Sequence, residues 1–275
     1  MKWEKDYIEG AARENHIIAG FNVFGYEDAQ AVIRAAEREG VPVLLMVNRD
    51  ARNTMEIEHW GALLCSLARR AAVPVGVHLD HCAEPDMIVR AIESGFTSVM
   101  YDGSDQPLAE NIRVTEMLVR QAHRAGVFVE AELGSVPYSD QGQTEVRLTD
   151  PDEASAMQRT GVDWLAVSVG NIHRLPVQKA ALQFPVLERI EQKCGLPLVI
   201  HGSSGIPEVD ILRLRGSRVG KMNFGTALRQ TFGNGLRREL ALHPVEFDRL
   251  RLFQKPVEDM EQHARQIISL LWKGR

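Results

Sequence analysis

The chain has 275 residues, of which 44% are hydrophobic and 25% charged, and its formal net charge is −5. This composition is that of a soluble globular protein. Because no basic patch, no signal peptide and no run of about 18 apolar residues stands out, we expect neither nucleic acid nor a membrane as a partner. The cysteines Cys65, Cys82 and Cys194 are widely spaced, which favours reduced thiols and a cytoplasmic location.

Short apolar runs alternate with stretches of helical periodicity along the chain. The runs expected to form strands are 17–23, 41–47, 75–79, 97–101, 127–133, 164–169, 196–200 and 219–223. The stretches expected to form helices are 26–39, 55–71, 85–95, 108–126, 150–160, 185–193 and 208–215. Strands that are apolar almost throughout and alternate with helices predict a parallel sheet covered on both faces. Eight such strands are enough to close a barrel.

We therefore predict an α/β fold, a (β/α)8 TIM barrel, with a doubly wound open sheet as the structural alternative. Residues 1–275 are expected to form a single domain because no Pro/Gly/Ser-rich linker divides them. Asp150 is predicted to cap a helix that has Pro151 at its first position. Residues 246–275 form a charged amphipathic stretch, expected to be a helical tail that packs on the barrel or on a neighbouring subunit.

Three histidines follow predicted strands: His81, His173 and His201 come after the third, sixth and seventh strands. In a TIM barrel the carboxyl ends of the strands meet at one mouth, where active sites lie. Three imidazoles with an open fourth position are typical of a catalytic zinc site. The alternative is that each histidine only satisfies hydrogen bonds of its loop.

Carboxylates accompany these histidines. Asp80 precedes His81 and is interpreted either as a proton carrier or as a residue that orients an imidazole. Glu130 and Glu132 alternate along one strand, so both side chains face the same side. If that side is the barrel interior, the pair indicates a second metal position or a salt bridge inside the barrel.

Small residues follow the last two predicted strands. Gly202, Ser203 and Ser204 precede a helix expected to begin near Pro207, and the segment 223–226 follows the eighth strand. Exposed backbone N–H groups near a helix N-terminus bind anions, and these two loops commonly hold phosphate in TIM barrels. Together they indicate a phosphorylated substrate.

Five segments of the chain resemble the class II fructose-bisphosphate and tagatose-bisphosphate aldolases, in order and over nearly the whole length. These segments are FNVFGYEDAQ at 21–30, HLDH at 78–81, GFTSVMYDGS at 95–104, VEAELG at 129–134 and HGSSGIP at 201–207. The resemblance implies a lyase that makes or cleaves a C–C bond of a ketose phosphate through a metal-stabilised enediolate of dihydroxyacetone phosphate. It also implies Zn2+ as cofactor, a monovalent cation near the phosphate, and a homodimer or homotetramer.

The resemblance also assigns roles to particular residues. Asp80 matches the catalytic acid/base that handles the proton of the C4 hydroxyl. The residues that match metal-binding positions are His81, His173, His201, Glu132 and Asp102. The residues that match substrate-binding positions are Asn22, Arg174, Gly202, Ser203, Ser204, Asn223, Phe224, Gly225 and Thr226. Gly225 stands where fructose-bisphosphate enzymes carry an acidic residue, which favours the tagatose-bisphosphate branch.

Three departures from the family pattern concern the substrate. Arg174 replaces the glycine that normally follows the zinc-binding histidine and helps to bind phosphate and a monovalent cation. Asn48 replaces a phosphate-binding serine. The mobile loop after Gly134 lacks its usual pattern and offers Tyr138, Asp140 or Glu145 as proton carriers. These changes leave open an aldolase for a different sugar or keto acid, or a non-catalytic aldolase-like scaffold subunit.

Overall fold

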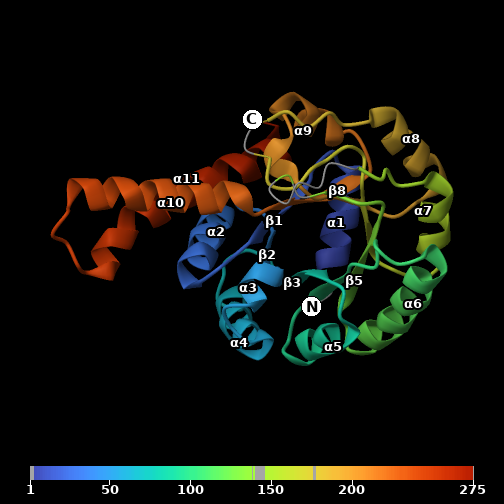
Figure 1. Cartoon of the computed structure of the whole chain (residues 1–275), viewed down its shortest axis with the longest axis horizontal. Helices are drawn as coiled ribbons and strands as arrows, with labels where there is room; N and C mark the ends of the chain where they lie inside the picture. The colour runs from blue at the N-terminus through green and yellow to red at the C-terminus, as the bar shows by residue number, and fades with distance from the viewer. Residues whose placement is uncertain (1–2, 138, 140–145, 176–177, 275) are drawn as a thin grey trace.

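The computed structural model describes residues 3–137, 139, 146–175 and 178–274. Its strands form a closed barrel of eight parallel strands in chain order, with the helices arranged around them (Figure 1). The strands are β1 Ile18–Asn22, β2 Val43–Val47, β3 Val75–Cys82, β4 Ser98–Tyr101, β5 Phe128–Leu133, β6 Trp164–Val167, β7 Leu198–Ile200 and β8 Val219–Phe224. Since β8 pairs with β1 as well as with β7, the barrel is closed, and the predicted TIM barrel is confirmed.

The third strand differs from its prediction because it continues three residues beyond Leu79. Its pairing with β4 shifts register between Leu79 and Cys82, and His81 has a φ of 47°. An extra residue in a strand bends it and re-aims side chains that would otherwise alternate between two faces. This irregularity allows the neighbours Asp80 and His81 to serve the same site.

The helices agree with the predicted stretches within a few residues, and three more were not predicted. The helices within predicted stretches are α2 Tyr26–Glu39, α4 Ile57–Ala68, α5 Pro85–Glu93, α6 Leu108–Arg124, α7 Pro151–Gln158, α8 Phe184–Lys193 and α9 Glu208–Leu214. The additional ones are α1 Trp3–Arg13, α3 Arg49–Arg52 and α10 Thr226–Leu242. Asp150 caps α7 as predicted, because its side chain accepts hydrogen bonds from the backbone N–H groups of Asp152 and Glu153.

Helices α10 and α11 lie side by side and extend away from the barrel (Figure 1). Helix α11, Arg249–Lys273, lies within the stretch for which a helical tail was predicted. Its buried residues Met260, Ala264, Ile268 and Leu271 recur on one face, and that face belongs to the main hydrophobic core. None of the described helices is both long and apolar enough to cross a membrane.

Helix α1 covers the end of the barrel where the strands begin. Ile8 packs with the apolar side chains inside the barrel. Its backbone lies so close to Gly220 that a Cβ on Gly220 would be 2.5 Å from the carbonyl oxygen of Ile8. Glu4 reaches in beside Gly76, fully buried, and its carboxylate accepts a hydrogen bond from Thr97. Burial raises the pKa of Glu4 to about 7, although Thr97, Ser98 and Lys221 act in the opposite direction.

This buried carboxyl group should make stability depend on pH. With a folded pKa of about 7 against an ordinary value of 4.5, the neutral form of Glu4 favours the fold below pH 4.5, and this contribution is lost as pH rises to about 7. The shift corresponds to about 3 kcal/mol. We expect Glu4→Gln to remove this part of the pH dependence, measured by urea unfolding of chelator-treated protein between pH 4.5 and 8.

Glu9→Gln, which alters a more exposed glutamate of the same helix, serves as the control and should keep the wild-type pH dependence. An unchanged slope in Glu4→Gln would show that Glu4 is ionised in the fold.

Candidate metal centre

Three imidazoles converge at the carboxyl end of the barrel. His81 belongs to the end of β3, His173 to the loop after β6, and His201 directly follows β7. Their rings contact one another edge to face, with centroids 5.0 Å apart for His81 and His173, 4.5 Å for His81 and His201, and 6.0 Å for His173 and His201. One ring nitrogen from each lies within 4.8 Å of the others. The predicted gathering of three distant histidines at one point is therefore present.

Two carboxylates fix how two of these rings are oriented. Asp102 lies 3.1 Å from Nδ1 of His81, and Glu130 lies 2.8 Å from Nε2 of His201. A ring nitrogen that faces a carboxylate carries the proton, so the opposite nitrogen holds a lone pair. Those opposite nitrogens, Nε2 of His81 and Nδ1 of His201, are only 2.7 Å apart. The two nitrogens are therefore close enough to bind the same ion.

The protonation of the histidines also suits a metal. Burial, followed by the proximity of His81, lowers the pKa of both His173 and His201 well below the ordinary value for histidine. Both rings are therefore neutral near pH 7, which is the form that binds a metal ion. Neutral imidazole nitrogens are donors that fit Zn2+, and His81 offers a third ring nitrogen at the same point. The residues present thus fit the divalent ion that the sequence predicted.

Asp80 lies beside the imidazoles and is held by two amides. The Nδ2 groups of Asn22 and Asn223 donate hydrogen bonds of 2.9 and 3.0 Å to its two oxygens. Burial acts to raise the pKa of Asp80, but His81, His201 and Lys221 outweigh it and lower the pKa below its usual value. Asp80 is therefore an oriented, ionised carboxylate that can accept a proton. The two asparagines, predicted as substrate contacts, also position this group.

Glu130 and Glu132 are both buried, but their surroundings differ. Glu130 pairs with Lys221 at 2.6 Å and accepts a hydrogen bond of 2.7 Å from Nε1 of Trp164, so the salt bridge considered for these glutamates holds for this one. Oε2 of Glu132 has no hydrogen-bond partner among the described residues and lies 3.6 Å from Nδ1 of His81. Burial and the proximity of Asp102 raise the pKa of Glu132 well above its usual value.

His81, Asp102 and Glu132 form a second group whose ligand atoms lie within 4.8 Å of one another. A buried oxygen without a hydrogen bond is costly, and a cation would satisfy it. Glu132 and Asp102 thus lie close enough to His81 to reach an ion that it holds, and their roles as metal ligands stay predictions from the family resemblance.

The predicted phosphate-binding segments meet the histidines in one pocket. Its lining includes nearly all the predicted substrate-binding residues, namely Asn22, Arg174, Gly202, Ser203, Ser204, Asn223, Gly225 and Thr226. Phe224 is the exception. It alternates with Asn223 along β8, so it faces away from the pocket and packs against Phe21 at 5.7 Å between ring centroids. Its role as a substrate contact stays a prediction from the family resemblance.

The turn after β7 requires glycine at its first residue. Gly202 has a φ of 65°, and a Cβ at this position would lie 2.6 Å from the backbone of Ile172. Ser203–Gly205 then form a short 3-10 helix, labelled η2, whereas α9 begins only at Glu208. The small residues therefore precede α9, which begins close to the expected position near Pro207, and they line the metal pocket.

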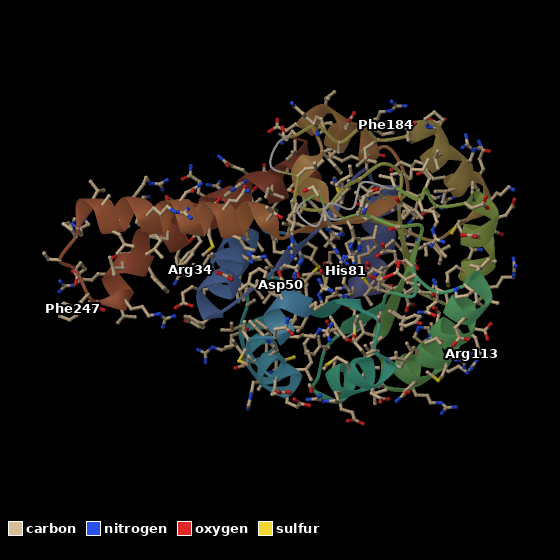
Figure 2. The ribbon with its side chains drawn as sticks, in the orientation of Figure 1. Arg34, Asp50, His81, Arg113, Phe184 and Phe247 are labelled. Carbon is tan, nitrogen blue, oxygen red and sulfur yellow. The ribbon has the colours of Figure 1, made fainter. Side chains whose placement is uncertain are left out.

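Two residues at the rim of the pocket, Asp50 and Arg229, were not predicted from the sequence. Arg174, in the left-handed region with a φ of 57°, pairs with Asp50 at 2.8 Å. The same oxygen of Asp50 lies 3.2 Å from Arg229, whose guanidinium is stacked over Phe24. Neither Asp50 nor Arg229 belongs to a motif that the sequence singled out. Of the proposed loop residues, Tyr138, Asp140 and Glu145 lie outside the described residues. Figure 2 labels Asp50 and His81 within the ring of helices.

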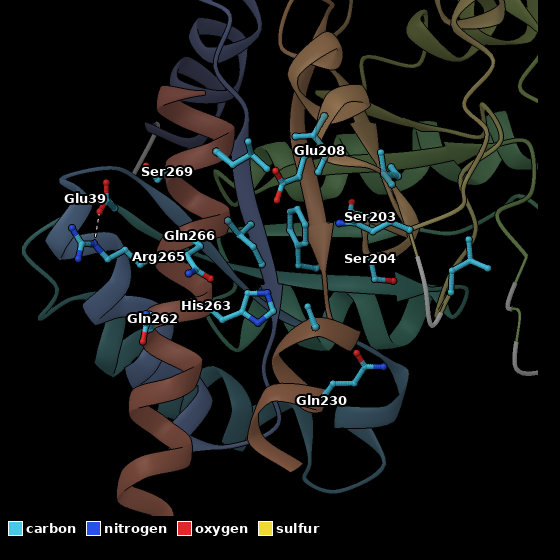
Figure 3. A pocket seen from close by; sticks show the side chains of 18 residues that line it. Glu39, Ser203, Ser204, Glu208, Gln230, Gln262, His263, Arg265, Gln266 and Ser269 are labelled. Atoms are coloured by element: carbon cyan, nitrogen blue, oxygen red, sulfur yellow. Dashed lines mark hydrogen bonds and ion pairs between the residues drawn. The ribbon is translucent and has the colours of Figure 1, made fainter. Parts of the chain in front are cut away.

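A larger hollow of about 790 Å³ adjoins this pocket, between α11, α9 and the end of β8 (Figure 3). It shares Ser203 and Ser204 with the metal pocket. Its other polar lining includes His263, whose Nδ1 is 2.7 Å from Oγ1 of Thr231, and Arg265, which pairs with Glu39. These groups satisfy one another, so the hollow lacks the converging ligands of the metal pocket.

Comparison with known proteins agrees with this geometry. The family model described as fructose-bisphosphate aldolase class-II matches residues 4–274. A sulfofructosephosphate aldolase of Alkalicoccus urumqiensis is 32% identical over 88% of this chain and 86% of its own length. A fructose-bisphosphate aldolase of Streptococcus pneumoniae is 36% identical over 90% of this chain and 87% of its own.

A solved structure shows the same similarity in three dimensions. The YdjI aldolase of Escherichia coli K12 superposes with a TM-score of 0.86 at 32% identity, covering 98% of this chain and 96% of that one.

The orientation of His81 by Asp102 predicts the effect of removing that carboxylate. We expect Asp102→Asn to weaken zinc binding by about 10–100-fold, because the imidazole loses the partner that fixes its ring and strengthens its donor nitrogen. Competition with a chromophoric chelator at pH 7.5 measures the affinity. Asp105→Asn, at an exposed position of the same loop, should bind zinc as the wild type does. Equal affinities for both variants would contradict the assignment.

Proposed function

Because the chain belongs to the class II fructose-bisphosphate aldolase family, and is thus a lyase, we propose that it makes and cleaves the C3–C4 bond of a ketose phosphate with zinc as its metal. The observation that carries the proposal is the meeting of three imidazoles with an ionised Asp80 in one pocket. His81, His173 and His201 would hold the ion, which supplies Lewis acidity at the ketone oxygen of the substrate.

Asp80 moves the proton of the reaction. In cleavage it accepts the proton of the C4 hydroxyl as the C3–C4 bond breaks, and C4 leaves as an aldehyde. The electron pair of the broken bond stays with the half that becomes dihydroxyacetone phosphate. In condensation Asp80 returns the proton to the new hydroxyl. Asn22 and Asn223 keep both carboxylate oxygens in place, so Asp80 need not reorganise during the step.

The phosphate of the substrate binds at the turn after β7 and the start of α10. Gly202, Ser203 and Ser204 offer a small-residue turn there, with Asn223 and Thr226 on the neighbouring segment. A monovalent cation beside the phosphate, a cytoplasmic location and a homodimer or homotetramer remain predictions from the sequence and its family resemblance.

We assign the substrate to the tagatose-bisphosphate type. The support is Gly225, which lines the pocket where fructose-bisphosphate enzymes are expected to carry an acidic side chain. The relatives named above are described as acting on fructose bisphosphate or sulfofructose phosphate, so both ketoses belong in the comparison. A phosphorylated sugar of another configuration is the second candidate, favoured by the pairing of Arg174 with Asp50 at the rim.

Replacement of Asp80 tests the mechanism. We expect Asp80→Asn to lower kcat for release of triose phosphate by about 10²–10⁴-fold, because the group that accepts the proton is lost. Zinc content should stay at the wild-type level, and Asp105→Asn should keep full activity. Removal of zinc with a chelator should abolish turnover, and its return should restore it. Wild-type protein that remains active after complete metal removal would overturn the proposal.

A substrate panel tests the assignment of the sugar. The initial rate of triose phosphate release is measured for tagatose bisphosphate, fructose bisphosphate and sulfofructose phosphate. We expect the highest kcat/KM for tagatose bisphosphate, because Gly225 leaves the C4 region free of an acidic side chain. A clear preference for fructose bisphosphate would contradict the assignment to the tagatose-bisphosphate type, and the proposed aldolase chemistry would still stand.

A further inference from the structure

An ion pair crosses the mouth of the barrel. Arg174 lies in the loop after β6 and Asp50 lies in α3, directly after β2. In a closed barrel of eight strands in chain order, β2 and β6 are on opposite sides. Arg229, in the first turn of α10 after β8, reaches the same oxygen of Asp50 from a third direction. Three segments far apart in the sequence are thus joined above the metal pocket.

The pocket beneath this cluster is small. Its volume is about 50 Å³, and one water needs at least about 10–15 Å³ of such space. The enclosed part of the pocket therefore has room for a few waters. Since Arg174 and Arg229 are themselves part of its lining, a substrate bound there would contact both guanidinium groups.

At the rim, the carboxylate of Asp50 lies between two guanidinium groups, as a bound anion would. One carboxylate oxygen of Asp50 accepts from two guanidinium groups, so Asp50 occupies the position that an incoming oxyanion would take. The side chains of Arg174, Asp50 and Arg229 are 26%, 32% and 50% exposed. Ion pairs with this much access to water contribute little to stability, so the carboxylate can be exchanged for another anion.

The backbone at Arg174 is also unusual. Its φ is 57°, and residues other than glycine adopt such a value only at an energetic cost. Ser139 fixes this conformation, because its Oγ donates to the carbonyl of Arg174 and its N–H donates to the carbonyl of His173. A strained residue held in this way, adjacent to a histidine of the metal site, indicates a role for its side chain in that site.

We propose that Arg174 is a specificity-determining residue whose guanidinium exchanges the carboxylate of Asp50 for a phosphate group of the substrate. The ion pair across the mouth then opens only for ligands that bring their own oxyanion. This inference rests on the proposed aldolase function and names a further contact for its substrate. The phosphate can come from the ketose donor or from the aldehyde acceptor, and both sources present the same monoester group to the bidentate guanidinium.

A kinetic test compares phosphorylated and unphosphorylated substrates in the condensation direction. Dihydroxyacetone phosphate is combined with glyceraldehyde 3-phosphate or glyceraldehyde, and dihydroxyacetone then replaces the donor. For Arg174→Ala we expect KM to rise by about 10–100-fold for the component whose phosphate is bound, because a charge-assisted hydrogen bond is lost. The KM of the unphosphorylated counterpart and the kcat should change little. An equal rise for both counterparts, or none, would overturn the proposal.

Three further variants distinguish anion exchange at Arg174 from simple structural support. Asp50→Asn removes the competing anion, so the KM for the phosphorylated component should fall; a rise like that of Arg174→Ala would show that Asp50 merely holds the arginine. Arg113→Ala, which breaks the exposed ion pair with Glu110 on α6, is the matched control and should leave KM unchanged (Figure 2). The KM of Arg174→Lys should lie between those of Arg174→Ala and the wild type, because lysine keeps the positive charge but lacks the planar guanidinium that forms two parallel hydrogen bonds.

A binding measurement keeps the inference independent of turnover. Glycerol 3-phosphate has no carbonyl group, so its calorimetric affinity for the zinc-loaded protein does not require aldolase activity. We expect it to bind about 10–100-fold more tightly to the wild type than to Arg174→Ala, and more tightly still to Asp50→Asn. If the wild type binds it no better than glycerol, the inference fails. Loss of retro-aldol activity with phosphate binding intact would instead refute the proposed function alone.

Discussion

The site depends on a buried chain of polar contacts that aims two imidazoles at each other. Lys221 pairs with Glu130 inside the barrel, Glu130 holds the outer nitrogen of His201, and Asp102 does the same for His81. The inner nitrogens are thereby brought to 2.7 Å from each other. An ion bound by both rings would add to the stability of the barrel mouth, so metal binding and stability are coupled.

The same network explains why Asp80 is suited to proton transfer. Its carboxylate is buried, a setting that by itself favours the protonated form, yet His81, Lys221 and the amide of Asn22 favour the ionised form and lower its pKa. Asn22 and Asn223 each donate a hydrogen bond to one of the two carboxylate oxygens of Asp80. Burial therefore strengthens the interaction of Asp80 with a substrate hydroxyl without leaving the charge unsupported, which is how an enclosed site can hold a reactive base at neutral pH.

The sequence predicted the barrel and the metal-binding histidines because both depend on local patterns. Apolar runs separated by helical periodicity specify parallel strands, and the carboxyl ends of such strands meet whatever their spacing in the chain. Lys221 was missed because it lies within an otherwise apolar run. Asp50 and Arg229 could not be assigned, since their pairing with Arg174 depends on a contact across the barrel rather than on any motif.

The turn at Gly202 has a consequence for anyone who wishes to redesign this enzyme. A Cβ there would meet the backbone of Ile172 and lie 2.9 Å from the nitrogen of His173, so even alanine would displace a histidine of the metal site. Mutant libraries aimed at a new acceptor should therefore leave this position unvaried. The rim offers the opposite situation, because Asp50 and Arg229 are partly exposed and can be randomised without disturbing the scaffold. The barrel thus tolerates substitution at its rim more readily than at this turn.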